Sequence, residues 1–350
     1  MTPQFWHGRR VLLTGHTGFK GSWLALKLAR AGARVTGIAL EPSTDPALFH
    51  AARVEETLER HIICDIRDRE ALRDAVRTSE PEIVFHLAAQ PLVRASYVDP
   101  VGTFATNVMG TVNLFDALAA MSGVKAIVNV TTDKVYWNEE RPGGYRESDR
   151  LGGRDPYAAS KACGELVTDS WRESFMAGRG IALASARAGN VIGGGDWADD
   201  RIIPDALRAW DRGEPLVVRA PRSVRPWQHV LEPLAGYVAL AEALIAEPER
   251  FSQAWNFGPS TEDARPVGWI ADYLTSTVEG FSWHTEGNDG PHEAGLLEVD
   301  STKALSALPW RPRWSLAEAL DRTVQWHSAW RGGQDAQAQC FAQIAEHEAP

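Results

Sequence analysis

The first half of the chain alternates short apolar segments with longer stretches in which apolar residues recur every three or four positions. Apolar segments that read as strands lie at residues 10–14, 34–40, 83–86, 126–131 and 181–187. Segments with helical periodicity lie between them, at residues 22–31, 69–78, 101–121 and 157–177. This alternation is typical of βαβ units, whose helices cover both faces of a parallel sheet. We therefore expect an α/β fold with a Rossmann-type doubly wound parallel sheet.

The pattern changes after Gly189, where Gly, Pro and Trp become frequent and the apolar segments become shorter. We expect a cofactor-binding domain at residues 1–188, a smaller α/β substrate-binding lobe at residues 189–330, and a weakly ordered C-terminal tail at residues 331–350. Elements around residues 225–250, including a helix at 231–245, are expected to return to the main sheet.

The composition excludes several classes of protein. The formal net charge is -10 and no long basic run occurs, so we expect no nucleic-acid partner. No segment approaches the roughly 18 consecutive apolar residues of a membrane span, and the start, MTPQFWHGRR, lacks the apolar core of a secretory signal. Cys64, Cys163 and Cys340 have spacings that match neither a disulfide framework nor a zinc site. We expect a cytoplasmic protein that holds no metal.

A glycine-rich turn follows the first expected strand. RRVLLT leads into Gly15, Gly18 and Gly21 and then into the helical SWLALKLARAG. A helix N-terminus offers unpaired N–H groups and partial positive charge, and glycines let the backbone approach a diphosphate closely. The spacing is that of short-chain dehydrogenases, although a plain tight turn is the alternative. The residues expected to bind a dinucleotide here are Gly15, Thr17, Gly18, Phe19, Lys20 and Gly21.

Further segments fit the same cofactor. In such folds an acidic residue at the end of the second strand often binds the adenosine ribose. Here Ala39 occupies that position, and Glu41 follows two residues later. These residues therefore do not distinguish NAD from NADP. Asp65 follows a strand-like segment, where its carboxylate could accept hydrogen bonds from the adenine amine. The other expected contacts are Ile66, Ala88, Ala89, Gln90 and Asn107. Each of these could instead belong to a loop or a cap.

Two groups of polar residues suggest catalysis. Tyr157 and Lys161 are four residues apart, hence on one face of a helix, and a nearby ammonium favours the phenolate form of tyrosine. Thr132, Asp133 and Lys134 follow an expected strand, so they emerge at the carboxyl edge of the sheet, where α/β sites form. The Thr132 hydroxyl could bind a substrate oxygen. An added acid and amine indicate chemistry beyond hydride transfer.

Several long strings carry a resemblance to a known family. GHTGFKGSWL, FHLAAQPLVRASY, the TDK triplet, YAASK, ARAGNVIGGGDW and VRPWQHVLEPL together resemble the CDP-glucose 4,6-dehydratase family, over residues 6–330. This family belongs to the extended short-chain dehydrogenases. The resemblance implies NAD as the cofactor and CDP-glucose as the substrate, in deoxysugar biosynthesis. The string VYWNEERPGGYRE departs from the family pattern just after TDK.

The resemblance also implies residue roles. Tyr157 would take the proton of the C4 hydroxyl, Thr132 would orient that oxygen, and Asp133 would protonate the departing C6 hydroxyl. Lys134 would be the C5 base, or would only stabilise the enolate electrostatically. The product would be a 4-keto-6-deoxy sugar. The residues expected at the substrate are Tyr97, Asn190, Arg201, Arg225 and His292, although each polar one could equally form a surface ion pair or cap.

The sequence leaves two alternative functions open and predicts a homodimer. Another nucleotide-sugar dehydratase, epimerase, reductase or decarboxylase is the nearest alternative, and a noncatalytic NAD-binding regulator is an alternative from another class. The helical segments at 101–121 and 157–177 have more apolar residues than one sheet-facing stripe needs. With the family resemblance, this predicts a homodimer through a four-helix bundle.

Overall fold

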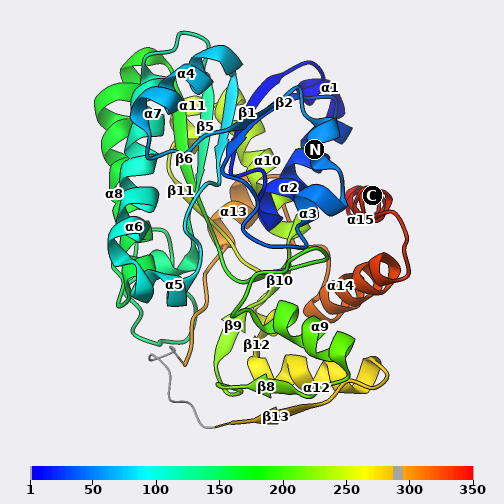
Figure 1. Ribbon diagram of the computed structural model, residues 1–350. Coiled ribbons are helices and arrows are strands. Elements are labelled where there is room, and N and C mark those ends of the chain that lie inside the picture. Colours follow the sequence, from blue (N-terminus) through cyan, green and yellow to red (C-terminus); the bar gives the residue numbers. More distant parts are fainter. Residues whose placement is uncertain (1, 287–294, 350) are drawn as a thin grey trace.

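The computed structural model describes residues 2–286 and 295–349 of the chain. Its main sheet has seven parallel strands in the order β11-β6-β5-β4-β1-β2-β3 (Figure 1). These strands are β1 (Arg10–Thr14), β2 (Arg34–Ala39), β3 (Arg60–Ile63), β4 (Ile83–His86), β5 (Ala126–Val130), β6 (Ala182–Ala188) and β11 (Ala254–Phe257). The strand order reverses direction at β1, which pairs with both β2 and β4. The expected doubly wound parallel sheet is confirmed, and its switch point lies between β1 and β4.

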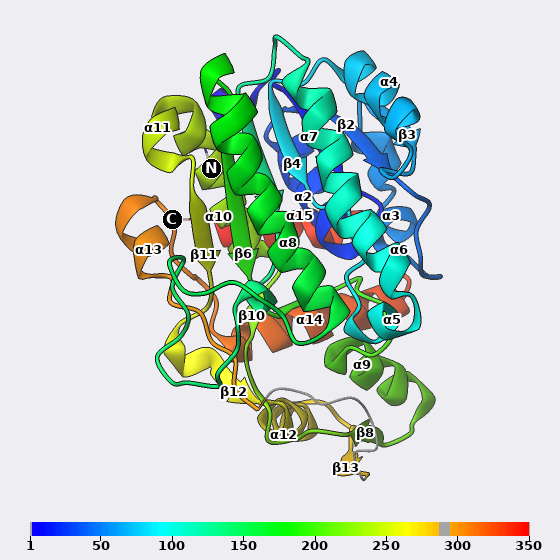
Figure 2. The same ribbon diagram turned by 90° about the vertical axis from the view of Figure 1, so that its left-hand side faces the viewer.

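Helices cover both faces of this sheet (Figure 2). One face packs against α4 (Arg69–Ser79), α7 (Thr111–Ala119) and α8 (Pro156–Trp171), and the other against α2 (Phe19–Arg30) and α10 (Leu231–Ala246). Alternate residues of each strand point to opposite faces: Val11 and Leu13 join one core cluster, whereas Leu12 joins the other. Because both faces are covered, the central strands are mostly apolar, as the sequence pattern indicated.

The two long helical segments contain wider turns. Residues 100–119 form α6 (Pro100–Phe104), the π-helical η2 (Ala105–Gly110) and α7 in direct succession. Likewise, α8 continues into the π-helical η4 (Arg172–Met176) and the short η5 (Ala177–Arg179). Asp99 and Asp155 cap the starts of α6 and α8, and Pro follows each cap.

A smaller lobe lies below the carboxyl ends of the strands in Figure 1. Three two-stranded sheets contribute to it, pairing β7 (Val191–Ile192) with β10 (Gln228–His229), β8 (Leu216–Val218) with β13 (Trp283–Thr285), and β9 (Val224–Pro226) with β12 (Ala264–Pro266). Residues of α9 (Ile202–Arg212), α12 (Val267–Thr277) and α14 (Leu316–Arg331) form its own apolar cluster. The remaining short elements are α1 (Pro3–Trp6), α3 (Leu48–Ala51), η1 (Val54–Thr57), α5 (Val93–Val98), η3 (Asp133–Val135), α11 (Pro248–Phe251), η6 (Thr261–Asp263) and α13 (Thr302–Ala307).

The expectation of a weakly ordered tail after residue 331 is wrong. Asp335 caps a helix, α15 (Ala336–Glu348), that packs on α2 and α14. Cys340 and Ile344, one turn apart, are fully buried in the core cluster of α2. Glu348 accepts a hydrogen bond of 2.6 Å from Lys27 Nζ in α2. Only a narrow stripe of this Gln- and Ala-rich helix is apolar, so its periodicity is faint in the sequence.

Candidate active site

A cavity of about 1040 Å³ runs along the carboxyl edge of the main sheet and reaches into the smaller lobe. Its walls come from the glycine turn after β1, the loops after β2 to β6, the start of α8, and parts of β8 and β9. This is the place where open α/β sheets bind ligands, beside the point at which the strand order reverses. The cavity is large enough for a dinucleotide and a second ligand side by side.

Two of the three glycines of the turn, Gly15 and Gly21, leave no room for a side chain. Gly15 has φ +77°, and a Cβ there would lie 2.7 Å from the backbone N of Ala88. A Cβ on Gly21 would lie 2.1 Å from the carbonyl oxygen of Gly15. All six residues expected to bind the dinucleotide in this turn line the cavity, at the N-terminus of α2. The turn is therefore shaped for the close approach of a diphosphate.

Most of the other expected cofactor residues also line the cavity. They are Asp65, Ile66, Ala88, Ala89 and Gln90. Asp65 is held by a 2.6 Å ion pair with Arg67, and this hydrogen-bonded guanidinium lowers the pKa of its carboxyl. Glu41 lines the cavity near the end of β2, beside Ala39. The direct contacts of these residues with a cofactor stay predictions.

Asn107 lies behind the cavity wall and does not line it. Its side chain accepts a hydrogen bond of 2.8 Å from the backbone N of Gln90 and donates to the Gln90 carbonyl at 3.1 Å. It also donates to Ser160 Oγ in α8 at 2.9 Å. Asn107 therefore positions the Gln90 loop against the helix that carries Tyr157.

The expected catalytic residues converge. Thr132 and Asp133 follow β5, and Tyr157 and Lys161 extend from α8 into the same cavity. Thr132 Oγ1 donates to Asp133 Oδ1 at 2.9 Å, and the Lys161 ammonium donates to the Val130 carbonyl at 3.2 Å. Asp133 Oδ2 is buried without a hydrogen-bond partner in the described part of the chain.

Burial and neighbouring groups shift the pKa values of Tyr157 and Lys161, the two expected catalytic residues of α8. Burial raises the pKa of the Tyr157 phenol to about 12, and a hydrogen bond with Thr132 acts in the opposite direction. Burial lowers the pKa of Lys161 to about 8, while the charge of Glu165 raises it. The Thr132 hydroxyl and the Tyr157 phenol thus face each other in the cavity, as a shared substrate oxygen requires.

A further amine faces this group from the glycine turn. The Lys20 ammonium lies 3.5 Å from the Tyr237 hydroxyl of α10, and its Nζ is 5.7 Å from the centre of that ring. Burial, Arg201 and Lys161 lower the pKa of Lys20 from 10.5 to about 7, and Asp133 raises it. The sequence predicted Lys20 as a cofactor contact, but its neighbourhood with the catalytic residues was not visible from the motif.

Most of the expected substrate residues line the same cavity. Tyr97, Asn190, Arg201 and Arg225 line it, whereas His292 lies outside the described residues. Arg201 forms a 3.0 Å ion pair with the buried Asp196. Four further arginines, which were not predicted from the sequence, also line the cavity: Arg67, Arg94, Arg154 and Arg219. Clustered guanidinium groups suit an anionic ligand in a protein of negative net charge.

Comparisons with known proteins agree with this geometry. The family model described as the NAD dependent epimerase/dehydratase family matches residues 11–256. This chain belongs to that family. It is similar to the CDP-glucose 4,6-dehydratase of Salmonella typhimurium, with 52% identity over 95% of this chain and 94% of the relative. The family resemblance inferred from the sequence motifs is therefore confirmed.

Solved structures of the family share the fold. An epimerase from Methanothermobacter thermautotrophicus superposes with a TM-score of 0.81 at 23% identity, covering 94% of this chain and 95% of its own. The dTDP-glucose 4,6-dehydratase of Bacillus anthracis, in complex with NAD, has a TM-score of 0.76 at 18% identity, covering 93% and 99%. The expected cofactor, NAD, is confirmed by the family, and the tight glycine turn fits its diphosphate.

Two features are absent from the described part of the chain. No helix among residues 2–286 and 295–349 is long and apolar enough to cross a membrane. In the same residues, no group of three or more His, Cys, Asp or Glu side chains is arranged to hold a metal ion.

Proposed function

We propose that this protein is a hydro-lyase that converts CDP-D-glucose to CDP-4-keto-6-deoxy-D-glucose in deoxysugar biosynthesis. The single observation that carries the proposal is the meeting of Thr132, Asp133 and Tyr157 in one cavity beside the glycine turn. The similarity to the Salmonella enzyme over nearly the whole chain supports the choice of reaction and nucleotide. Bound NAD supplies a hydride acceptor for C4 of the sugar and a hydride donor for C6.

Oxidation at C4 requires a base for the hydroxyl proton. Tyr157 receives this proton while Thr132 holds the sugar oxygen, since the two side chains face each other in the cavity. The pKa of Tyr157 is about 12 without ligands, so a positive neighbour must stabilise its phenolate. Lys161, one turn further along α8, is that neighbour.

Water loss then requires an acid and a base. The C4 ketone acidifies the C5 hydrogen, and removal of that proton expels the C6 hydroxyl, which leaves as water after Asp133 protonates it. The buried Asp133 Oδ2 has no partner among the described residues, so it is available for that hydroxyl. Lys134 lines the same cavity and is our candidate for the C5 base, with electrostatic stabilisation of the enolate as its alternative role.

The diphosphate of the substrate needs cations that line the cavity. Arg201 and Arg225 are our candidates, with Asn190 as an amide donor and Tyr97 at the rim. His292 remains a prediction from the sequence. A nucleoside diphosphate carries about two negative charges, which paired guanidinium groups neutralise better than single amines.

A substrate panel tests the reaction and the nucleotide together. The NAD-loaded enzyme is incubated separately with CDP-glucose, dTDP-glucose, UDP-glucose and GDP-mannose, and the products are identified by mass. We expect the loss of one water from CDP-glucose alone. A product of unchanged mass would instead indicate an epimerase, the activity named for the Methanothermobacter neighbour. No product from any nucleotide sugar would favour a noncatalytic regulator.

Two variants test the division of roles. Tyr157→Phe should abolish oxidation, so no reduced-nicotinamide absorbance should develop on mixing with substrate. Asp133→Asn is isosteric and should still form reduced cofactor but stall before dehydration. If both variants fail before any reduced cofactor forms, the assignment of Asp133 to the elimination step is wrong.

We also propose that the protein forms a homodimer through the helices on the α8 side of the sheet, in the foreground of Figure 2. Exposed apolar side chains gather on α5, α6, η2, α8 and η4: Tyr97, Val98, Val101, Phe104, Met109, Leu166 and Phe175. Leu166→Glu should shift the protein to monomer-sized elution at micromolar concentration. Val217→Glu, an exposed apolar residue of β8 in the smaller lobe, is the control that should leave the dimer intact. A monomeric wild-type protein would contradict the proposal.

We place the enzyme in the cytoplasm. The three cysteines are all free, which fits a reducing compartment. Fractionation of cells that express the protein with its native N-terminus would test this, since recovery from the periplasm would contradict it.

A further inference from the structure

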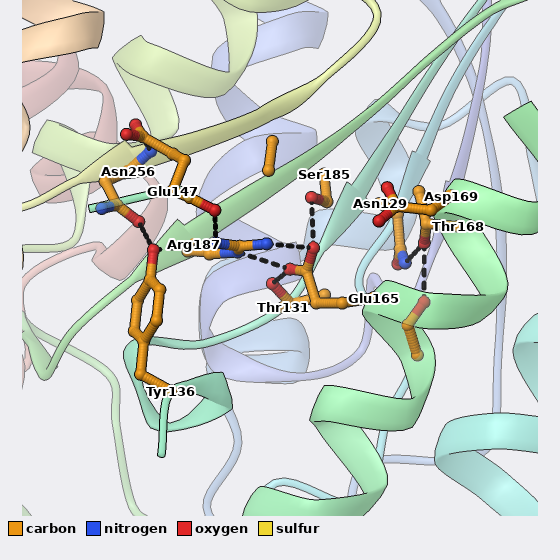
Figure 3. A network of polar contacts seen from close by, with 12 residues as sticks. Asn129, Thr131, Tyr136, Glu147, Glu165, Thr168, Asp169, Ser185, Arg187 and Asn256 are labelled. Carbon is orange, nitrogen blue, oxygen red and sulfur yellow. Dashed lines mark hydrogen bonds and ion pairs between the residues drawn. The ribbon is translucent and has the colours of Figure 1, made fainter. Parts of the chain in front are cut away.

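Behind the catalytic residues lies a buried ion pair that does not line the cavity. Glu165 of α8 and Arg187 of β6 meet at 2.7 Å, with side chains only 0% and 3% exposed (Figure 3). Four hydrogen bonds converge on the Glu165 carboxylate. Thr131 and Ser185 donate their hydroxyls at 2.5 and 2.6 Å, and Arg187 donates through Nε at 2.9 Å and Nη2 at 2.7 Å.

This carboxylate joins the two elements that carry the catalytic groups. Thr131 immediately precedes Thr132 at the end of β5, and Glu165 lies one helical turn after Lys161 in α8. Glu165 therefore binds the strand end with one oxygen while its helix presents Tyr157 and Lys161 to the cavity. Any movement of α8 away from β5 would break the bond to Thr131 and separate Thr132 from the phenol.

Arg187 extends the network to the opposite side. Its Nη1 donates to the Tyr136 hydroxyl at 2.8 Å, and that hydroxyl donates to Asn256 Oδ1 of β11 at 2.7 Å. Tyr136 lines the cavity just after Lys134. The Arg187 guanidinium is thus fixed by Tyr136 on one side and by Glu165 on the other, so its positive charge stays next to the Glu165 carboxylate.

Glu165 also favours the protonated, positively charged form of Lys161. Lys20 approaches from α2 and His86 from β4, and Tyr157 lies on the same helix. Burial lowers the pKa of His86 to about 3, so its ring is neutral and offers no negative charge. Glu165 is the group whose charge raises the pKa of Lys161 against the effect of burial. Burial would also neutralise Glu165, but Arg187 and the two hydroxyls hold its pKa below the ordinary value.

We propose that Glu165 is a positioning residue of the reaction, which keeps Lys161 positively charged and holds Thr132 within reach of Tyr157. Arg187 acts through Glu165 by keeping the carboxylate ionised. Neither residue touches the cavity, so neither is a catalytic residue. The inference rests on the proposed function, because the charge on Lys161 matters only if Tyr157 must become a phenolate.

The test removes the buried charges as a pair. Glu165→Gln alone would leave Arg187 unpaired in the core and could unfold the protein, so the Glu165→Gln/Arg187→Met double variant is used beside it. Both are compared with Thr168→Val. Thr168 lies on the same helix and accepts a buried hydrogen bond of 2.7 Å from Asn129 of β5, so this control loses an uncharged link between the same two elements.

The first measurement is the rate of cofactor reduction after NAD-loaded enzyme is mixed with CDP-glucose, followed across pH. The pH above which the rate falls is its high-pH limit. We expect this limit to be about 1 to 3 pH units lower in the double variant, because the Glu165 charge that favours the Lys161 ammonium is gone. The rate at pH 8 should fall about tenfold or more, whereas KM should change little. Thr168→Val should keep the wild-type pH limit even if its melting temperature falls.

The second measurement does not depend on activity. The chain has six lysines. NMR of the NAD-free protein with isotopically labelled lysine, assigned with Lys161→Met, can therefore follow the titration of Lys161 directly. A folded double variant in which Lys161 titrates as in the wild type, with an unchanged pH limit, would overturn the inference. A wild-type enzyme that never reduces its cofactor with any nucleotide sugar would overturn the proposed function instead.

Discussion

Replacement of Lys20 by methionine should stabilise the NAD-free protein. Lys20 points into the cavity toward Tyr237, near Lys161 and Arg201, and these surroundings disfavour its charge. Methionine has nearly the same length and no charge, so it can occupy the same space without the cost of desolvation. The wild-type residue thus trades stability for a cation at the cofactor site.

The magnitude follows from proton linkage. The pKa of Lys20 is lowered from 10.5 to about 7, so between these pH values the unfolded chain binds a proton that the folded chain does not. Wild-type stability therefore rises with pH across this window, by about 1.4 kcal/mol per pH unit, and the full cost of about 5 kcal/mol is present below about pH 7. The Lys20 side chain is partly exposed, which reduces the cost of its charge, and we expect roughly half of this value.

Urea unfolding of NAD-free wild type and Lys20→Met provides the assay. The variant should gain about 2 to 3 kcal/mol at about pH 7, and the gain should shrink steadily as the pH is raised toward about 9.5. Lys125→Met is the control, because this exposed lysine pairs only at the surface, with Glu82 at 3.3 Å. Its effect should stay within about 0.5 kcal/mol at each pH. Equal stability of wild type and Lys20→Met at all pH values would refute the reasoning.

Three further variants or reagents test other parts of the structure. Ile344→Ala, in the fully buried stripe of α15, should lower the free energy of unfolding by about 2 to 5 kcal/mol in a urea titration, and a loss below 1 kcal/mol would mean that the helix is not packed as described. Gly21→Ala would place a methyl group 2.1 Å from the carbonyl oxygen of Gly15, so NAD affinity measured by tryptophan fluorescence should fall at least tenfold. Gly178→Ala is the control, because a Cβ at Gly178 meets open space and this variant should bind NAD normally. Burial raises the pKa of Cys340 to about 12, so a thiol reagent should modify it only at the rate of unfolding, and rapid labelling in native buffer would contradict its burial.

The sequence predicted best what depends on local pattern. The expected strands at residues 10–14 and 83–86 match β1 and β4 residue for residue, because each is a continuous apolar run with polar or turn residues at both ends. The glycine turn and the predicted catalytic residues also lie in one cavity. Both motifs were recognisable in the sequence, because the turn precedes a helix N-terminus and Tyr157 and Lys161 are one helical turn apart.

What the sequence did not predict depends on contacts between distant residues. Glu165 and Arg187 look like ordinary surface charges of a helix and a strand, and only the fold shows that they neutralise each other in the core. The low pKa of Lys20 arises first from its burial and then from the charges of Arg201 and Lys161, which lie far away in the chain. The helix α15 was missed because only one buried residue per turn is apolar: Ala336, Cys340 and Ile344.

The packing of α15 on α2 has a consequence for synthesis of the protein. Lys27 and Glu348 are 321 residues apart in the chain, yet their side chains meet at 2.6 Å. The helix that begins at the glycine turn leaves the ribosome long before α15, and one side of it stays uncovered until the residues of α15 follow. We therefore expect the nascent chain to need protection from aggregation until α15 has emerged, and to bind NAD firmly only from that point.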